Sequence, residues 1–186
     1  MKKLILASQS PRRKEILQNA GLDFEVRVAG IEESQRPGEP PAAYVRRLAM
    51  EKAEAVQAGP GEVVLAADTV VVVDSTVLGK PGSQSEAKEM LRLLSGREHR
   101  VLTGICLRDS ERSIVDCVET TVRFMPMSDD EIDWYVTTGE PMDKAGAYAI
   151  QGLGSRFIDR IEGCYWNVVG LPLSTVYRYL RTEFGV

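Results

Sequence analysis

Two hydroxyl side chains and two guanidinium groups lie within six residues near the amino terminus, in the segment SQSPRR at 8–13. Ser10 is a favourable helix cap and Pro11 a favourable first helical residue, so the free N–H groups of a helix that starts here point back into the loop. Such N–H groups and arginine side chains both bind phosphate oxygens. The segment predicts an anion site, although an ordinary cap beside two solvated arginines, Arg12 and Arg13, explains the same residues.

A carboxylate stands in the middle of the most β-branched stretch of the chain, VVLAADTVVVVD at 63–74. Apolar residues on both faces predict a buried strand over 62–74, and Asp68 and Thr69 interrupt its apolar run. Burial of an unpaired ionised group costs on the order of several kcal/mol, so Asp68 must be hydrogen-bonded, paired, metal-bound or placed at a cleft. A functional role explains Asp68 better than the structural alternative, in which it accepts backbone hydrogen bonds from a nearby loop.

Three lysines in unusual positions are candidates for neutralising phosphate charge. Lys52 lies on an otherwise apolar helix face, Lys80 lies in the turn GKPG at 79–82, and Lys144 lies in the segment PMDKAGAYAIQG. Most lysines are solvated surface residues, so each of them alone is a weak signal. Glu33, in a loop, is a candidate to join Asp68 in holding a divalent cation through oxygen ligands.

Composition excludes several other kinds of site. The chain has 23 basic and 27 acidic residues, which argues against non-specific binding to duplex nucleic acid. Its single histidine, His99, excludes sites that need two imidazoles, and three widely spaced cysteines form neither a disulfide framework nor a thiolate zinc site. The Gly-rich segment 146–154 lacks Walker and dinucleotide-binding spacing. If the protein is an enzyme, carboxylates, lysines and arginines must do the chemistry.

Length and hydropathy set the expected class of protein. A chain of 186 residues with 44% hydrophobic residues fits one domain, or two small lobes that share a core. The longest purely apolar stretch, 63–67, is far shorter than the roughly 20 residues that span a bilayer, and the amino terminus lacks a signal-peptide core. We therefore expect a cytoplasmic protein with no membrane partner.

The expected elements alternate between strands and helices, which predicts an α/β or α+β domain. Strands are expected over 3–7, 24–28, 62–74, 76–78, 100–108, 113–124 and 156–161. Helices are expected from Pro11 to Gly21, over 42–57, from Ser85 to Gly96, from a capping box at Ser128 to near Gly139, and from 173 onward.

Eight motifs in this order and spacing resemble the Maf family, over almost the whole chain. They are SQSPRR at 8–13, the Glu-containing loop at 32–33, LAMEKA at 48–53, ADTVV at 67–71, LGKP at 78–81, LSGR at 94–97, GEPMDKAGAYAIQGLG at 139–154 and NVVGLP at 167–172. The resemblance implies one domain over 1–186 with the fold of inosine triphosphate pyrophosphatases: an elongated mixed β-sheet flanked by helices, with two lobes and a central cleft. It also implies a cytoplasmic homodimer that hydrolyses nucleoside triphosphates to monophosphate and pyrophosphate and so cleans the nucleotide pool.

Residue roles follow from the matching positions of the family. Asp68 corresponds to the proton acceptor that activates water, and Glu33 corresponds to a residue that helps it hold a divalent metal, Mg, Mn or Co. The implied catalytic set is completed by Lys80. Because Glu32-Glu33 replaces the more usual Asp-Glu pair, it stays open which of these two carboxylates contacts the metal.

Substrate recognition is implied in the same way. Arg12, Arg13, Lys52 and Lys80 are expected to bind the triphosphate, and Ser8 fits the same pocket. Members resembling the branch that prefers dTTP and UTP share a set of discriminating residues, which here are Arg12, Thr69 and Gln151. A Gln side chain can answer both the donor and the acceptor of a pyrimidine amide edge, so a base-reading role suits it chemically.

Two other functions stay open from the sequence. One is a non-catalytic nucleotide-binding regulator of septum formation, which would bind nucleotides without turnover. The other is a house-cleaning enzyme for ITP or XTP, which rests on fold similarity alone. The preferred substrate among dTTP, UTP, CTP and modified forms also stays open, since pocket shape changes such preferences by only about 1–3 kcal/mol.

Overall fold

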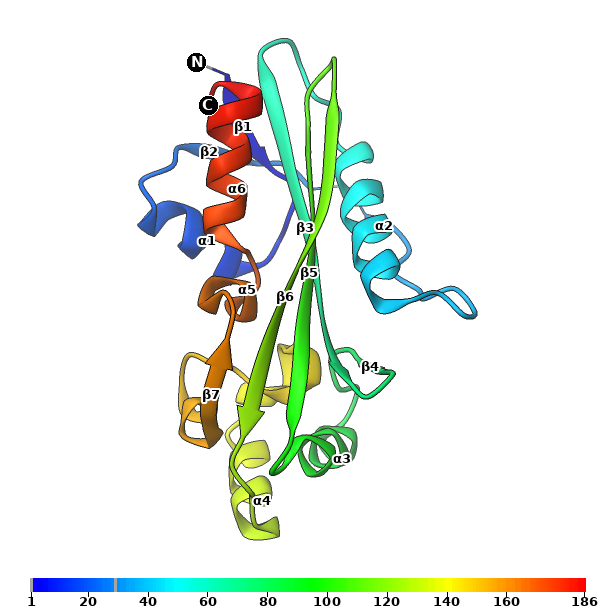
Figure 1. Cartoon of the computed structure of the whole chain (residues 1–186), viewed down its shortest axis with the longest axis vertical. Coiled ribbons are helices and arrows are strands. Elements are labelled where there is room, and N and C mark those ends of the chain that lie inside the picture. Colours follow the sequence, from blue (N-terminus) through cyan, green and yellow to red (C-terminus); the bar gives the residue numbers. More distant parts are fainter. Residues whose placement is uncertain (1, 29) are drawn as a thin grey trace. The chain divides into compact units, whose positions relative to one another are not determined.

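Strands from both halves of the chain form a mixed sheet in the order β2-β1-β3-β5-β6-β7, with β4 paired to β3 (Figure 1). The computed structural model describes residues 2–28 and 30–186. β1 pairs in parallel with β2 and β3, whereas the β3–β4 and β6–β7 pairs are antiparallel. The strands are β1 Lys3–Leu6, β2 Phe24–Val26, β3 Glu62–Val73, β4 Thr76–Leu78, β5 Glu98–Arg108, β6 Ser113–Phe124 and β7 Ile158–Glu162.

Helices separate most of the strands along the chain. They are α1 Pro11–Asn19, α2 Pro41–Glu54, α3 Gln84–Leu94, α4 Asp129–Thr137, α5 Tyr165–Val169 and α6 Leu173–Tyr179. Short 3-10 segments cover Glu140–Asp143, Ala145–Ala147 and Leu153–Phe157, and a π-helical turn covers Leu180–Phe184. Within the described part of the chain, none of the helices combines the length and apolar character that a bilayer crossing requires.

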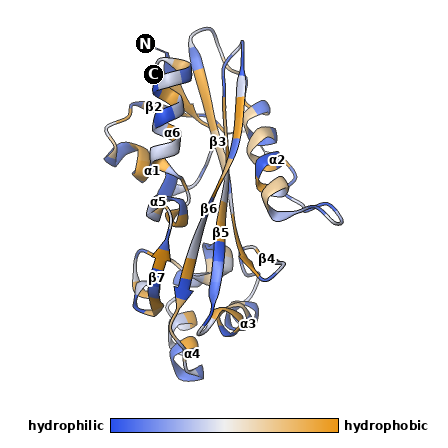
Figure 2. Cartoon of the chain, viewed as in Figure 1, coloured by the Kyte–Doolittle hydropathy of each residue, from blue (hydrophilic) through white to orange (hydrophobic). Residues whose placement is uncertain are grey.

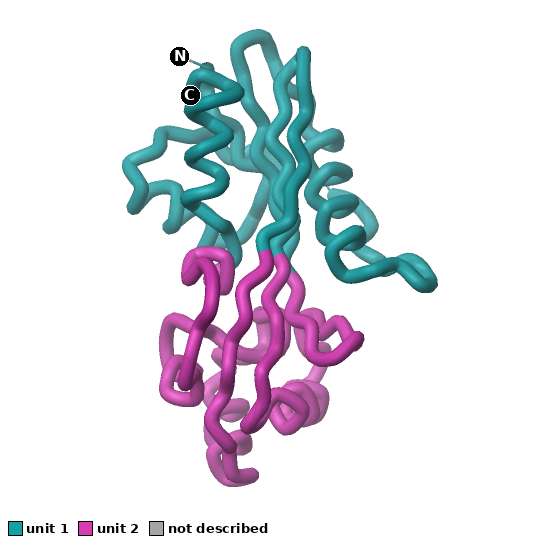
Figure 3. The backbone as a smooth tube through the Cα atoms, viewed as in Figure 1, with its two compact units in different colours: residues 1–69, 103–118, 170–186 teal, residues 70–102, 119–169 magenta. Residues whose placement is uncertain are grey.

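The chain divides into two compact units, which agrees with the expected two lobes (Figure 3). Unit 1 contains residues 1–69, 103–118 and 170–186, and unit 2 contains residues 70–102 and 119–169. The strands β3, β5 and β6 contribute residues to both units. The expected cleft between the lobes stays a prediction.

Small side chains let α2 approach the sheet in unit 1. Ala49 and Ala53 of α2 pack with Ile5 of β1, Ala66 of β3 and Cys106 of β5 in one buried cluster. Figure 2 shows hydrophobic residues over much of β3, as expected for a strand buried on both faces. This close packing positions α2, and with it Lys52, beside β3.

Unit 2 has a core richer in aromatic rings. Phe124 and Tyr148 pack edge to face with ring centroids 4.7 Å apart, and Tyr135 packs edge-on against Phe157. The Tyr135 hydroxyl donates to Glu140 at 2.7 Å, and the same carboxylate accepts the N–H groups of Leu153 and Gly154. These bonds hold the segment between α4 and β7 in place. The sequence motif at 139–154 lies in this segment.

Several expected boundaries are confirmed by cap chemistry. Ser10 caps α1 with Pro11 as its first residue, and Ser128 forms the expected capping box with Glu131. The long strand expected over 62–74 is confirmed, because β3 continues through Asp68 and Thr69. The short helix α5 was not expected.

Burial of His99 in unit 2 makes stability depend on pH. Its side chain is 2% exposed, and its Nε2 lies 2.7 Å from the Tyr148 hydroxyl. Burial lowers the pKa of His99 from 6.5 to about 4. Between these values the unfolded chain binds a proton that the folded chain does not, so the part of the stability that depends on a neutral His99 is fully present above pH 6.5 and is lost as the pH falls toward 4.

We expect this group to lower the free energy of unfolding by about 2 kcal/mol between pH 7.5 and pH 5. Urea titrations at the two pH values measure the difference, and His99→Gln is the control because glutamine does not titrate. Most carboxylates titrate below this window. If His99→Gln loses as much stability between pH 7.5 and pH 5 as the wild type does, the pH dependence does not come from His99.

Candidate active site

The loop after β1 turns into α1 through hydroxyl side chains. The Ser8 Oγ accepts the Ser10 N–H at 3.2 Å, and the Ser10 Oγ accepts the Arg13 N–H at 3.5 Å. These bonds fix the first turn of α1, so the predicted strand, loop and helix arrangement around 8–13 is confirmed. Arg12 lies at the start of this helix and is half-buried.

Arg13 is buried and ties three segments of unit 1 together. Its Nε donates to the Gly170 carbonyl at 2.8 Å, its Nη1 to the Ser8 Oγ at 3.1 Å and its Nη2 to the Thr69 Oγ1 at 3.1 Å. Burial lowers the pKa of Arg13, and the negative charges of Asp68 and Glu33 oppose that effect. The guanidinium thus holds Thr69, one of the predicted discriminating residues, in a defined position.

The hydroxyl of Thr69 has a second hydroxyl beside it. Thr69 Oγ1 lies 2.9 Å from Thr103 Oγ1 on β5 and 3.4 Å from the Gly170 carbonyl. Neither Thr103 nor Gly170 was expected at this site. Thr103 reaches Thr69 from strand β5 without any local sequence signal, whereas Gly170 belongs to the motif at 167–172, for which no role at this site was predicted.

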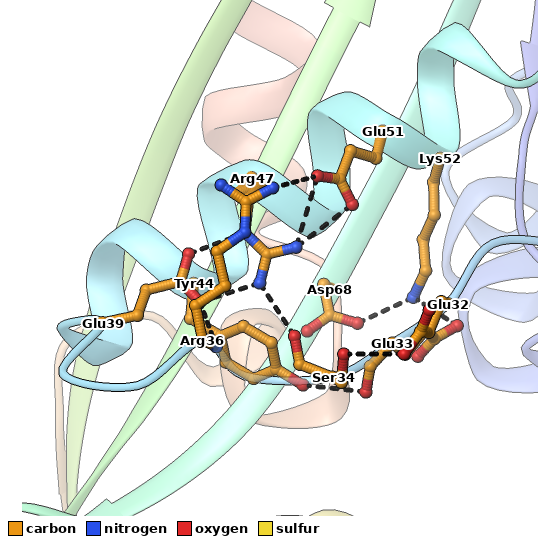
Figure 4. A network of polar contacts seen from close by, with 10 residues as sticks. All are labelled: Glu32, Glu33, Ser34, Arg36, Glu39, Tyr44, Arg47, Glu51, Lys52 and Asp68. Carbon is orange, nitrogen blue, oxygen red and sulfur yellow. Dashed lines mark hydrogen bonds and ion pairs between the residues drawn. The ribbon is translucent and has the colours of Figure 1, made fainter.

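Asp68 has the partner that its burial demands. It is 8% exposed in the middle of β3, and its Oδ1 accepts a hydrogen bond from the Lys52 Nζ at 2.7 Å (Figure 4). The Lys52 ammonium also lies 3.0 Å from the Glu33 Oε1. Two carboxylates and one ammonium therefore meet between α2, β3 and the loop after β2, and this confirms that Asp68 is paired.

The structure separates the two adjacent glutamates of the loop. The Glu33 carboxylate reaches Lys52, whereas Glu32 accepts a hydrogen bond from the Ser34 hydroxyl at 3.2 Å. Tyr44 of α2 lies near the same charges. Its pKa is raised by burial and raised further by the carboxylates of Asp68 and Glu33. Glu33 is thus the glutamate that shares the Lys52 ammonium with Asp68.

The donor set fits a divalent metal that arrives together with phosphates. Asp68 and Glu33 place carboxylate oxygens around one position, now taken by the Lys52 ammonium. Residues 2–28 and 30–186 hold no group of three or more His, Cys, Asp or Glu side chains placed to bind a metal. Mg²⁺ is commonly held by one or two carboxylates plus substrate phosphates, and this pair matches that pattern.

The remaining predicted residues belong to unit 2. Lys80 is exposed in the turn after β4, and the neighbouring Gly79 carbonyl accepts the Gly146 N–H at 3.0 Å. Gln151 is exposed between the second and third 3-10 segments. Lys144 donates to the Glu140 carbonyl at 3.1 Å and pairs with Asp143. The roles of Lys80 and Gln151 in a shared site stay predictions.

Known proteins are similar to this chain over nearly its full length. A family model described as Maf-like protein matches residues 3–183. A dTTP/UTP pyrophosphatase of Anaeromyxobacter dehalogenans is 55% identical over 96% of this chain and 93% of the relative. Relatives with the same name are 53% identical in Symbiobacterium thermophilum, over 100% of this chain and 95% of the relative, and 47% identical in Bacillus cereus, over 97% and 95%.

Among solved structures, the Ham1 protein of Staphylococcus aureus is similar with a TM-score of 0.51. The sequences are 15% identical, and the match covers 98% of this chain and 100% of that one. At this identity the likeness concerns the fold alone. It agrees with the mixed sheet flanked by helices that the resemblance implied.

Proposed function

The chain belongs to the Maf family, and from this premise we propose that it is a nucleoside triphosphate pyrophosphatase acting on dTTP and UTP. The observation that carries the proposal is the buried Asp68 in a contact with Lys52, which also meets Glu33. Relatives named dTTP/UTP pyrophosphatase supply the substrate class. Water adds across the phosphoanhydride bond between the α and β phosphates, this bond breaks, and the products are the nucleoside monophosphate and pyrophosphate.

Asp68 is the group that accepts the proton of the attacking water. A general base must be held at a defined position, and β3 together with the Lys52 ammonium at 2.7 Å holds this carboxylate. A second requirement is charge neutralisation, because phosphoryl transfer is catalysed mostly by positioning and electrostatics. Arg12, Arg13, Lys52 and Lys80 neutralise the triphosphate oxygens, and Arg13 does so from a buried position beside the Ser8 and Thr69 hydroxyls.

A divalent cation bound with the nucleotide would neutralise phosphate charge and polarise the phosphorus–oxygen bonds. Glu33 and Asp68 are the residues that would hold it. Asp68 lies on strand β3 and Glu33 lies on the loop before α2, so the two carboxylates would reach the cation from different elements.

Base selection is assigned to Arg12, Thr69 and Gln151. The Thr69 hydroxyl is held by Arg13 and lies beside Thr103, so its orientation is defined before substrate binds. Gln151 presents one amide that can donate and accept at once. Together they favour dTTP and UTP, with CTP and modified pyrimidine nucleotides as further candidate substrates. A cytoplasmic homodimer with no nucleic-acid partner completes the proposal.

Release of pyrophosphate from a panel of nucleoside triphosphates tests this function. We expect turnover of dTTP and UTP with magnesium or manganese, much less with ITP and XTP, and none with EDTA. The panel separates the alternatives, because preferential turnover of ITP would assign a purine enzyme. If nucleotides bind in a calorimeter but no pyrophosphate is released with any metal, a non-catalytic regulator replaces the pyrophosphatase.

A further inference from the structure

The loop that carries Glu33 has neither strand nor helix to hold it. Residues 31–40 lie in the connection between β2 and α2, and most of them are exposed. Glu33 nevertheless reaches the Lys52 ammonium at 3.0 Å. An exposed loop samples many conformations unless other groups restrain it, so a defined Glu33 requires a restraint.

Arg47 of α2 supplies contacts to this loop from one guanidinium (Figure 4). Its Nε and Nη2 donate to the two Glu39 carboxylate oxygens at 2.6 and 2.7 Å, and Nη2 also donates to the Ser34 carbonyl at 2.9 Å. Its Nη1 donates to Glu51, one turn along the same helix. The guanidinium therefore joins both ends of the segment 34–39 to α2.

The Arg47–Glu39 pair is sheltered from water. The side chains are 12% and 10% exposed, and the hydrogen bond from Arg47 lowers the pKa of Glu39 to about 2. Glu39 also accepts the Arg36 N–H at 3.0 Å, which closes the turn of the loop. Such a two-pronged contact depends on the planar fork of arginine, which lysine lacks.

A neighbouring contact acts directly on Glu33. The Tyr44 hydroxyl donates to the Glu33 carbonyl at 3.3 Å, and the Arg47 guanidinium lies 5.6 Å from the centre of the Tyr44 ring. Residues 33 and 34 are thus both held through their backbone carbonyls from α2. The same helix carries Lys52, so it positions both the carboxylate and the ammonium that faces it.

We propose that Arg47 is a positioning residue that holds Glu33 beside Lys52 and Asp68 and thereby sets the affinity for the divalent cation. The inference rests on the proposed function, in which Glu33 and Asp68 hold that cation. The Arg47 guanidinium donates to Glu39, Ser34 and Glu51. It acts through the loop, as residues behind metal ligands do when they orient those ligands.

The test compares Arg47→Met with Arg46→Met in the full-length protein. Arg46 is the exposed neighbour on α2, so the control makes the same chemical change one residue away. We expect Arg47→Met to raise the half-saturating Mg²⁺ concentration for dTTP turnover about tenfold, with a much smaller change in kcat at saturating Mg²⁺. Arg47→Lys should give an intermediate shift, and Arg46→Met none.

Two readouts do not depend on turnover. Hydrogen exchange measured by mass spectrometry should show faster exchange of amides 31–39 in Arg47→Met, and titration with Mn²⁺ alone should show weaker binding. Glu39→Gln, which leaves Arg47 on its helix, should act in the same direction even if Arg47→Met folds poorly. Unchanged exchange and Mn²⁺ affinity in Glu39→Gln and a folded Arg47 variant would overturn the proposal.

A double variant asks whether Arg47 acts through Glu33. When Glu33→Gln is already present, Arg47→Met should add no further increase in the half-saturating Mg²⁺ concentration. Increases that multiply would mean that Arg47 acts by another route and would overturn the proposal. If the wild type releases no pyrophosphate, the proposed function is wrong. The hydrogen-exchange and Mn²⁺ measurements still decide the role of Arg47 in that case.

Discussion

Replacement of Asp68 by asparagine is expected to lower kcat for pyrophosphate release about a thousandfold while the chain stays folded. Asparagine has nearly the shape of aspartate, but its amide oxygen does not take a proton from water near neutral pH. The loss therefore falls on the chemical step. The change also removes half of the proposed metal site, so the half-saturating Mg²⁺ concentration should rise as well.

The fold should survive this change because Lys52 keeps a partner. Stranding a buried charge costs about 3–5 kcal/mol, but in Asp68→Asn the Lys52 ammonium still lies beside the Glu33 carboxylate. Urea unfolding should therefore show a much smaller loss of stability. The amide that replaces the carboxylate also keeps an oxygen that accepts the Lys52 hydrogen bond.

Asp74→Asn is the matched control for this experiment. Asp74 follows β3 directly, and its exposed carboxylate pairs with Arg97. Its φ of 52° suits asparagine, which adopts the left-handed region more readily than most residues. We expect kcat to stay near the wild-type value. An Asp68→Asn protein that keeps wild-type kcat would remove Asp68 from the role of base.

Elements with local cap chemistry could be predicted from the sequence. The start of α1 depends on Ser10 and Pro11, and the start of α4 depends on Ser128 and Glu131, so each signal lies within four residues. The helix α5 was missed because Tyr165–Val169 is too short to show a periodic pattern. Local chemistry is readable where its partners are neighbours in the chain.

The candidate site shows the same limit. A carboxylate inside an apolar strand predicted that Asp68 needs a partner, and Lys52 on an apolar helix face was a candidate for a special role. The strand expected over 62–74 stays continuous because Asp68 pairs with Lys52 and Thr69 accepts from Arg13, so both polar side chains are satisfied without leaving β3. Partners on other elements are invisible to a window of sequence.

Arg47 illustrates what the sequence hides altogether. An arginine on a helix is usually a solvated surface residue, and its partners Glu39 and Ser34 lie in a loop with no pattern of its own. The side chain becomes informative only when its fork is seen against that loop. The sequence does not reveal the role of Gly104 for a different reason. That role depends on the absence of a Cβ atom at this position.

Gly104→Ala is expected to destabilise the protein by at least about 3 kcal/mol. Gly104 lies in β5, and a Cβ built there would be 2.1 Å from the Val45 carbonyl oxygen and 2.7 Å from the Arg46 nitrogen. Both atoms belong to the backbone of α2, so no side chain can rotate away to make room. The whole helix must shift from the sheet, against the close packing of its alanines.

The shift of α2 should impair activity as well as stability. α2 carries Lys52, and a displacement of about 1 Å at a catalytic group can cost about a hundredfold in rate. Urea unfolding measures the first effect, and kcat/KM for dTTP measures the second in whatever fraction stays folded. Gly79→Ala is the stability control, since its Cβ would meet nothing within 4 Å. Equal stability of the two variants would show that α2 yields at this contact, and unimpaired kcat/KM would show that Lys52 does not depend on how closely α2 packs against β5.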